Sequence, residues 1–161
     1  MKKQLKILLI DNEPGFIKMS RNALAISGYQ VITAQDKKNG LEITENEAPD
    51  LVIIGAIEPQ GDAFKLNKEL RDNPRTQIIP ILIVDVRSEE HSLKGWRWYE
   101  GMQMNAEDYT SRPIQAAELI RLVKRILDRL NSSKPVDSVE IVGRIEEILK
   151  RVENLEKLLT A

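Results

Sequence analysis

Charged side chains stand where short apolar runs of this sequence end. Asp11 directly follows one run, Asp85 closes a later one, and Arg112 follows a weaker run. A guanidinium keeps its charge and needs an anionic partner where it is partly buried, so Arg112 could form a fixed ion pair with Asp11 or Asp85. Another run ends at Gly55, which has no side chain and cannot supply a nucleophile.

The composition removes several kinds of chemistry. The 161 residues include no cysteine and a single histidine, His91, which excludes disulfides, thiolate metal sites, a cysteine nucleophile and sites built from several histidines. The sequence contains no G-x-S-x-G elbow, no P-loop and no G-x-G-x-x-G loop. We therefore expect no enzymatic activity and no cofactor.

Charge and hydropathy argue against two kinds of partner. Lys and Arg number 24 and Asp and Glu number 25, and the resulting net charge of −1 lacks the basic footprint of a nucleic-acid-binding protein. No apolar run is long enough to cross a bilayer, and the run that ends before Asp11 is too short for a signal peptide. We expect a cytoplasmic protein that binds neither nucleic acid nor membrane.

Five short segments rich in β-branched residues alternate with helical patterns. The expected strands are residues 5–10, 29–34, 50–55, 79–85 and, more weakly, 106–110. Pro14 opens the first helix and Gly28 ends it, a fourth helix is expected around Leu93 and Trp96, and Pro113 opens the fifth. Such continuous apolar strands are typical of a parallel sheet covered by helices, whose functional crevice lies beyond the carboxyl ends of the strands.

A second pattern follows the five repeats. We expect a globular domain at residues 1–131, a polar linker at 132–137 and a helix at 138–161. Apolar residues recur in this helix at alternating spacings of four and three, which is the pattern of a coiled-coil seam. The seam residues are Ile141, Ile145, Ile148, Val152, Leu155 and Leu159. The helix either packs against its own domain or, as we favour, joins copies of the chain into a homodimer.

Three aromatic residues cluster between residues 87 and 108. Helical spacing places Trp96 and Tyr99 on one face and Trp98 on another, so at least one ring is expected at the surface. The rings either divide between core and ordinary surface or form a protein-binding patch, since Trp and Tyr are enriched at interfaces. We expect His91, at a polar helix start, to be an ordinary surface residue.

Four stretches of the sequence together resemble one family. They are "LLIDNEP", "TAQDKKNGLEITENEAPDLVIIG", "EPQGDAFKLNKELRDNPRTQIIPILIV" and "AEDYTSRPI". In their order and spacing, residues 5–130 resemble the receiver domain of two-component response regulators, the CheY-like family with a flavodoxin-like fold. The resemblance implies an α/β fold of five strand–helix repeats with strand order 2-1-3-4-5, and a signalling function exerted through protein partners.

The resemblance also implies a role for each strand-end position. In the family, two acidic residues after the first strand help to hold Mg²⁺, and an aspartate at the end of the third accepts a phosphoryl group from a histidine kinase. A Ser or Thr ends the fourth strand, an aromatic residue lies on the fifth, and a Lys precedes a proline. The corresponding residues here are Asp11 and Asn12, Gly55, Asp85, Tyr109 and Arg112.

These departures from the family pattern predict a degenerate pocket. Gly55 cannot be phosphorylated, Asn12 weakens a cation site that prefers carboxylates, and a carboxylate at Asp85 would repel a phosphoryl group. We expect Arg112 to form a fixed, metal-free ion-pair cluster with Asp11, Asp85 or both. The alternative is that these three side chains are simply solvated at the mouth of the crevice.

The sequence therefore predicts a pseudo-receiver, a signalling or scaffold module that binds proteins without accepting phosphate. Glu13 and Glu58 lie near the same crevice, but we interpret them as ordinary turn residues and not as cation ligands. Two alternatives stay open. One is a conventional phosphorelay receiver with another acceptor, such as Asp50 or Asp62, and the other is a small ligand-binding or enzymatic domain on the same fold.

Overall fold

The computed structural model describes residues 3–132 and 138–160, and the side chains of residues 3–130 and 144–159. The chain divides into two compact units, Met1–Leu127 and Asp128–Ala161. We expected the first domain to end at residue 131, and the division falls slightly earlier, within a helix that continues past it. Residues 133–137 of the expected linker lie outside the described residues.

The first unit alternates strands with helices along the chain. In chain order the elements are β1 (Lys6–Ile10), α1 (Pro14–Ile26), β2 (Gln30–Ala34), α2 (Lys37–Glu47), β3 (Leu51–Ile54), α3 (Asp62–Asp72), β4 (Ile81–Asp85), a 3₁₀ turn (Ser88–Glu90), α4 (His91–Lys94), α5 (Trp98–Met102), β5 (Asp108–Ser111), α6 (Ala116–Ser132) and α7 (Ser138–Thr160). All five expected strands are present, with ends within two residues of those predicted.

The five strands form one parallel sheet in the order β2-β1-β3-β4-β5, which confirms the expected fold class and strand order. Ile10 at the end of β1 pairs with Ala34 of β2 and Ile54 of β3. Asp85 at the end of β4 pairs with Ser111 of β5. The residues that follow the strands therefore meet along one edge of the sheet.

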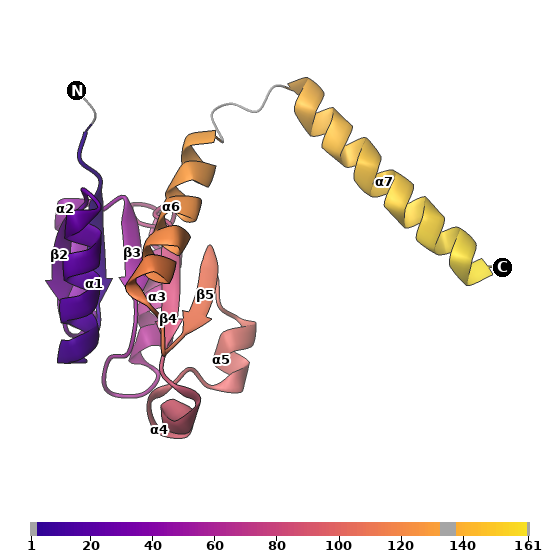
Figure 1. The fold of residues 1–161 in the computed structure, drawn as a ribbon. Coiled ribbons are helices and arrows are strands. Elements are labelled where there is room, and N and C mark those ends of the chain that lie inside the picture. The colour runs from indigo at the N-terminus through magenta and orange to yellow at the C-terminus, as the bar shows by residue number, and fades with distance from the viewer. Residues whose placement is uncertain (1–2, 133–137, 161) are drawn as a thin grey trace. The chain divides into compact units, whose positions relative to one another are not determined.

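Helices cover both faces of the sheet (Figure 1). On the face of α1 and α6, Leu9 packs in one buried cluster with Phe16 and Leu122. On the face of α2 and α3, Leu8 packs in a second cluster with Leu66. Side chains of a strand point alternately to the two faces, so the continuous apolar runs fill both cores.

The segment between β4 and β5 corrects the prediction of a single fourth helix around Leu93 and Trp96. The helix breaks at Gly95, which is extended, so α4 and α5 are separate short helices. A Cβ on Gly95 would come within 2.6 Å of the His91 ring, which explains the glycine there. Leu93 is 76% exposed, whereas Trp96 is buried and meets the ring of Phe64 edge to face.

The C-terminal helix α7 is present as predicted, at Ser138–Thr160. The preceding helix α6 runs to Ser132, the first residue of the expected linker. Within the described ranges, 3–132 and 138–160, none of the helices combines the length and apolar character that crossing a membrane requires.

Candidate functional site

Asp11 directly follows β1 at the strand-end edge of the sheet and is fully buried. Its Oδ1 accepts a hydrogen bond from the backbone N–H of Glu13 (2.7 Å), and its Oδ2 accepts one from the backbone N–H of Ala56 (2.7 Å). Burial raises the pKa of Asp11, whereas the Arg112 guanidinium and the two backbone N–H groups oppose this shift by favouring the carboxylate.

Arg112 follows the edge strand β5, and its side chain extends along the strand ends to reach Asp11 after β1. Its Nη2 pairs with Asp11 Oδ2, and its Nη1 lies 2.5 Å from Glu13 Oε2. The guanidinium lies 3.9 Å from the centre of the Phe16 ring, and the residue is only 7% exposed. Arg112 therefore belongs to a buried ion-paired cluster with Asp11, as one form of our expectation had it, and is not solvated at the crevice mouth. Glu13, which we interpreted as an ordinary turn residue, is a member of this cluster.

Gly55 is the residue that makes room for the ion pair. A Cβ built on its backbone would collide with Asp11 Oδ2 and come within 2.6 Å of Arg112 Nη2. The space that a side chain at this position would fill is therefore occupied by the carboxylate and the guanidinium. Any larger residue would have to displace one of the two charges.

The Mg²⁺ ion that the resemblance implies does not fit these residues. Both Asp11 oxygens already accept hydrogen bonds, and Arg112 brings a positive charge directly onto Oδ2. Mg²⁺ needs several oxygen ligands in a near-octahedral arrangement. In the part of the chain that the structure describes, no group of three or more acidic, His or Cys side chains is placed to hold a metal ion.

Asp85 is buried, but it does not join the Arg112 cluster. Its Oδ1 accepts hydrogen bonds from the backbone N–H groups of Val86 (2.8 Å) and Trp96 (3.3 Å). Its Oδ2 accepts one from the hydroxyl of Tyr109 (2.6 Å) and lies 3.1 Å from His91 Nε2. The carboxylate thus ties β4 to β5 and to the α4–α5 segment.

His91 is a site residue that the sequence analysis missed. Its side chain is 44% exposed, as expected for a surface position, yet its ring contacts the buried Asp85. The sequence offers only a weak signal, since the single histidine of the chain follows a strand-end carboxylate by six residues.

Asn12 and Glu58 line an open crevice beside the ion pair. The crevice has a volume of about 540 Å³, and Gln60, Leu93 and Lys94 also line it. Asn12 donates its backbone N–H to the carbonyl of Ala56 (2.9 Å), which fixes the loop after β1. The family's second acidic position therefore lies on the crevice wall, outside the ion pair.

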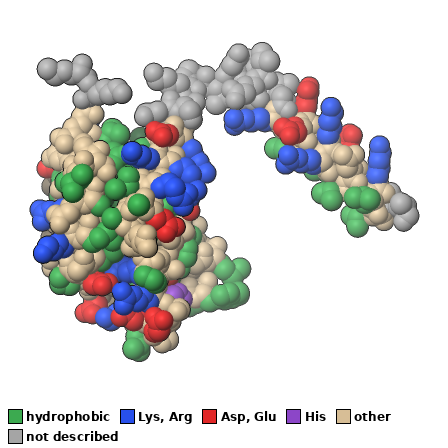
Figure 2. Space-filling view, viewed as in Figure 1, with side chains coloured by type: hydrophobic (Ala, Val, Ile, Leu, Met, Phe, Trp, Pro, Cys, Tyr) green, Lys and Arg blue, Asp and Glu red, His purple; other side chains and the backbone are tan. Residues whose placement is uncertain are grey.

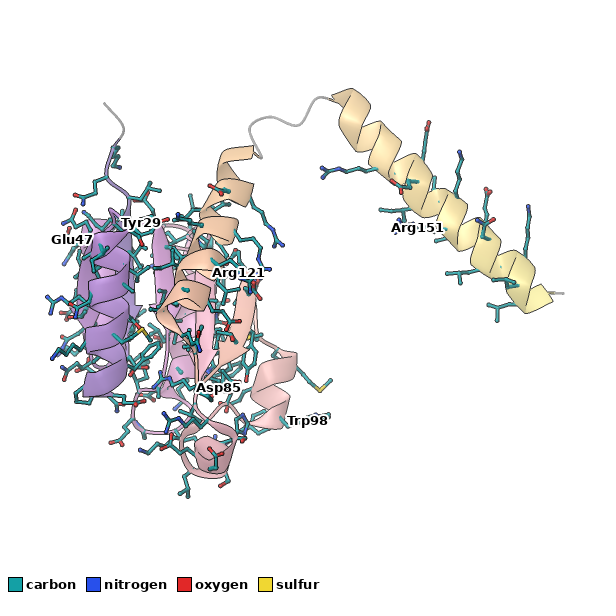
Figure 3. The ribbon with its side chains drawn as sticks, viewed as in Figure 1. Tyr29, Glu47, Asp85, Trp98, Arg121 and Arg151 are labelled. Carbon is teal, nitrogen blue, oxygen red and sulfur yellow. The ribbon has the colours of Figure 1, made fainter. Side chains whose placement is uncertain are left out.

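An apolar groove lies next to Asp85 on the α5 side. It has a volume of about 360 Å³, and Trp96, Trp98, Met102 and Tyr109 are among its lining residues. Trp98 is 80% exposed and points away from the sheet (Figure 3), and Tyr99 is about half exposed. Hydrophobic side chains project at this place close to the histidine (Figure 2). Trp96 is core, and Trp98 and Tyr99 are surface.

Replacing Gly55 with Ala should destabilise the protein, because the new methyl group must separate Asp11 from Arg112. Overpacking of this kind lowers the free energy of unfolding by about 1–3 kcal/mol. Gly15→Ala is the matched control, since its Cβ meets nothing within 4 Å. Urea unfolding of both variants measures the difference. Equal stability of the two would contradict the close contact at Gly55.

Tyr109 should ionise at a higher pH than an ordinary tyrosine. Burial raises its pKa, and the hydrogen bond and the negative charge of Asp85 raise it further. Because the folded-state pKa is the higher one, Tyr109 stabilises the fold below about pH 10, and this contribution is lost as the pH rises through the folded-state value.

Alkaline absorbance titration checks the shift, with Tyr109→Phe identifying which of the three tyrosines gives the signal. In the Asp85→Asn variant the pKa of Tyr109 should fall back toward its usual value, because the neutral amide keeps the shape but removes the charge. A Tyr109 transition that is the same with and without Asp85→Asn would exclude this coupling.

Comparisons with known proteins place the chain in a family. PilH of Pseudomonas aeruginosa is 26% identical over 122 residues, which cover 76% of this chain and 97% of PilH. A solved response regulator from Chloroflexus aurantiacus is 27% identical, with a TM-score of 0.68 over 78% of this chain and 99% of that one. CheY4 of Vibrio cholerae, at 22% identity and a TM-score of 0.65, has the same fold over 77% of this chain and 99% of its own.

A longer relative matches the same region. The alkaline phosphatase synthesis transcriptional regulatory protein PhoP of Bacillus subtilis is 33% identical over 124 residues, which cover 77% of this chain but only 49% of PhoP. The chain thus spans about half the length of this regulator. Residues 7–124 match the response regulator receiver domain, and the chain belongs to this family of two-component signalling proteins.

Proposed function

We propose that this chain is a pseudo-receiver, which signals through protein contacts and not through phosphorylation. The observation that carries the proposal is the Asp11–Arg112 ion pair, which fills the space above Gly55. A receiver of the usual kind needs an acceptor carboxylate and a bound cation at this place. Here the acceptor position has no side chain, and a cation of the protein's own already neutralises Asp11.

Neither of the other aspartates that we considered is favoured as an acceptor. Asp50 precedes β3, at the opposite edge of the sheet from the crevice, and its Oδ2 accepts the backbone N–H of Lys6 (2.7 Å). Asp62 begins α3, seven residues beyond Gly55. At neither place does the described part of the chain gather three or more acidic, His or Cys side chains that could hold a metal ion, which does not favour a conventional phosphorelay.

Incubation with acetyl phosphate and Mg²⁺ tests the proposal directly. The mass of the intact chain should not change, because no carboxylate is placed to attack the phosphoryl group next to a metal ion. A receiver with an aspartate at the acceptor position, treated in parallel, verifies the reagent. Addition of one phosphoryl group to this chain would overturn the proposal, and peptide mapping would then locate the acceptor.

The exposed groove beside α5 is the surface that we assign to a protein partner. Trp98 and Met102 are 80% and 69% exposed, and they stand next to the buried Trp96 and the Asp85 contacts. Tryptophan is among the residues most enriched at the energetic centres of protein interfaces. A partner bound in this groove would contact the β4–β5 side of the domain, where Asp85 connects β4 to Tyr109 of β5 and to His91 and Trp96.

Replacing Trp98 with Ala should abolish partner binding without affecting the fold, because the ring is almost fully outside the core. Ile78→Ala is a matched control, since Ile78 is also 80% exposed but lies between α3 and β4, outside the groove. Quantitative affinity purification with the two variants compares the captured proteins. If both variants retain the same proteins, the groove does not bind a partner.

Self-association through α7 is the second part of the proposed function. The described seam residues Ile145, Ile148, Val152, Leu155 and Leu159 are 45–86% exposed. Ile141 lies on α7, but its side chain is outside the described residues. Apolar side chains repeating at this spacing are stabilised when a second helix covers them, so we assign to α7 the role of forming a homodimer.

A further inference from the structure

The hydrophobic side chains of α7 lie mainly along one edge of the helix (Figure 2). The heptad positions a and d of a coiled coil are its two apolar positions. In α7, position a is occupied by Ile145, Val152 and Leu159, and position d by Ile148 and Leu155. In a parallel coil, β-branched residues at a, as in the first two of these heptads, and leucine at d favour two strands over three or four. Ile148 at d departs from this pattern, which concerns the number of strands and not their orientation.

The residues beside the seam decide between parallel and antiparallel helices. Arg151 occupies position g and Glu156 position e of the following heptad. In a parallel pair these two positions face each other across the interface, so Arg151 of each copy meets Glu156 of the other. Opposite charges then flank the seam on both sides.

The antiparallel alternative places like charges together. In an antiparallel pair the apolar residues of the seam pack together when Ile145 of one helix lies opposite Leu155 of the other, and Val152 lies opposite Ile148. Position g of one helix then neighbours position g of the other, which brings Arg151 next to Arg151 of the second copy. Juxtaposed like charges are a recognised means of rejecting a wrong pairing.

We propose that α7 pairs with α7 of a second copy as a parallel two-stranded coiled coil, with Arg151 of each copy against Glu156 of the other. The proposal rests on the self-association proposed above and adds its orientation. Within one chain, Arg151 lies 3.2 Å from Glu147, but both side chains are largely exposed, and such a pair is weak enough to be exchanged. Parallel pairing tethers both receiver domains to the same end of the coil.

Single cysteines in the full-length chain test the orientation, because the protein has no cysteine of its own. Oxidised glutathione serves as the oxidant: two cysteine thiols, one from each chain, become one disulfide, and the glutathione disulfide is reduced to two glutathione thiols. Val152→Cys should give a disulfide-linked dimer, since each a residue meets its own copy in a parallel pair. Lys150→Cys, on the outer face of the helix, should not.

An equimolar mixture of Ile145→Cys and Leu155→Cys chains should form only like-with-like dimers, which mass spectrometry distinguishes. The two positions are ten residues, about 15 Å, apart along a helix, so a mixed disulfide forms only if the helices are antiparallel. A predominance of mixed dimers would overturn the parallel orientation while leaving self-association intact.

The charged residues provide a second, independent readout. Arg151→Glu should raise the dimer dissociation constant about tenfold, since two attractive contacts become repulsive, and the double variant Arg151→Glu/Glu156→Arg should restore it. Sedimentation equilibrium of the unmodified chain gives the mass. A monomer at every concentration would overturn both self-association and its orientation, and a trimer would overturn the two-stranded pair alone.

Discussion

The ion pair between Asp11 and Arg112 is the interaction on which the pocket depends. Burying two charges costs more than their attraction returns unless the remaining hydrogen-bonding groups are also satisfied. Asp11 meets this condition through two backbone N–H groups. Arg112 meets it in part: its Nη1 pairs with Glu13 and its guanidinium contacts the Phe16 ring, while its Nε has no hydrogen-bond partner among the described residues. The contact between Asp11 and Arg112 needs the space above Gly55. The glycine is therefore part of a fitted arrangement and not merely a missing acceptor.

The order of the strands explains why the two buried aspartates serve different partners. Arg112 follows β5 but reaches Asp11 after β1, so its side chain passes the ends of β4 and β3, which lie between. Gly55 leaves that path open at β3. Asp85, at the end of β4, instead points to the α5 side, where Tyr109 and the α4–α5 segment satisfy it. One edge of the sheet thus carries two separate polar clusters.

The sequence predicts most of the fold but only part of the site. Continuous apolar runs reveal the strands, whereas the strand order came from the resemblance to receivers. The periodicity around Trp96 predicts one helix because it takes no account of Gly95, whose extended backbone separates α4 from α5. The charge on Arg112 indicated its need for a carboxylate, but the participation of Glu13 depends on loop geometry that no residue spacing encodes.

A switch needs a ligand that binds one of its states better than the other. In the proposed function the strand-end pocket offers no such choice, because the cation that pairs with Asp11 is a side chain of the same domain and does not exchange with solution as a bound metal ion does. Several of the large apolar side chains that folding leaves exposed lie around Trp98 and along the described part of α7. Partners that cover these groups stabilise the bound state by an amount that grows with the logarithm of their concentration. A receiver with a permanently paired pocket would therefore respond to how much partner is present, and not to whether a kinase is active.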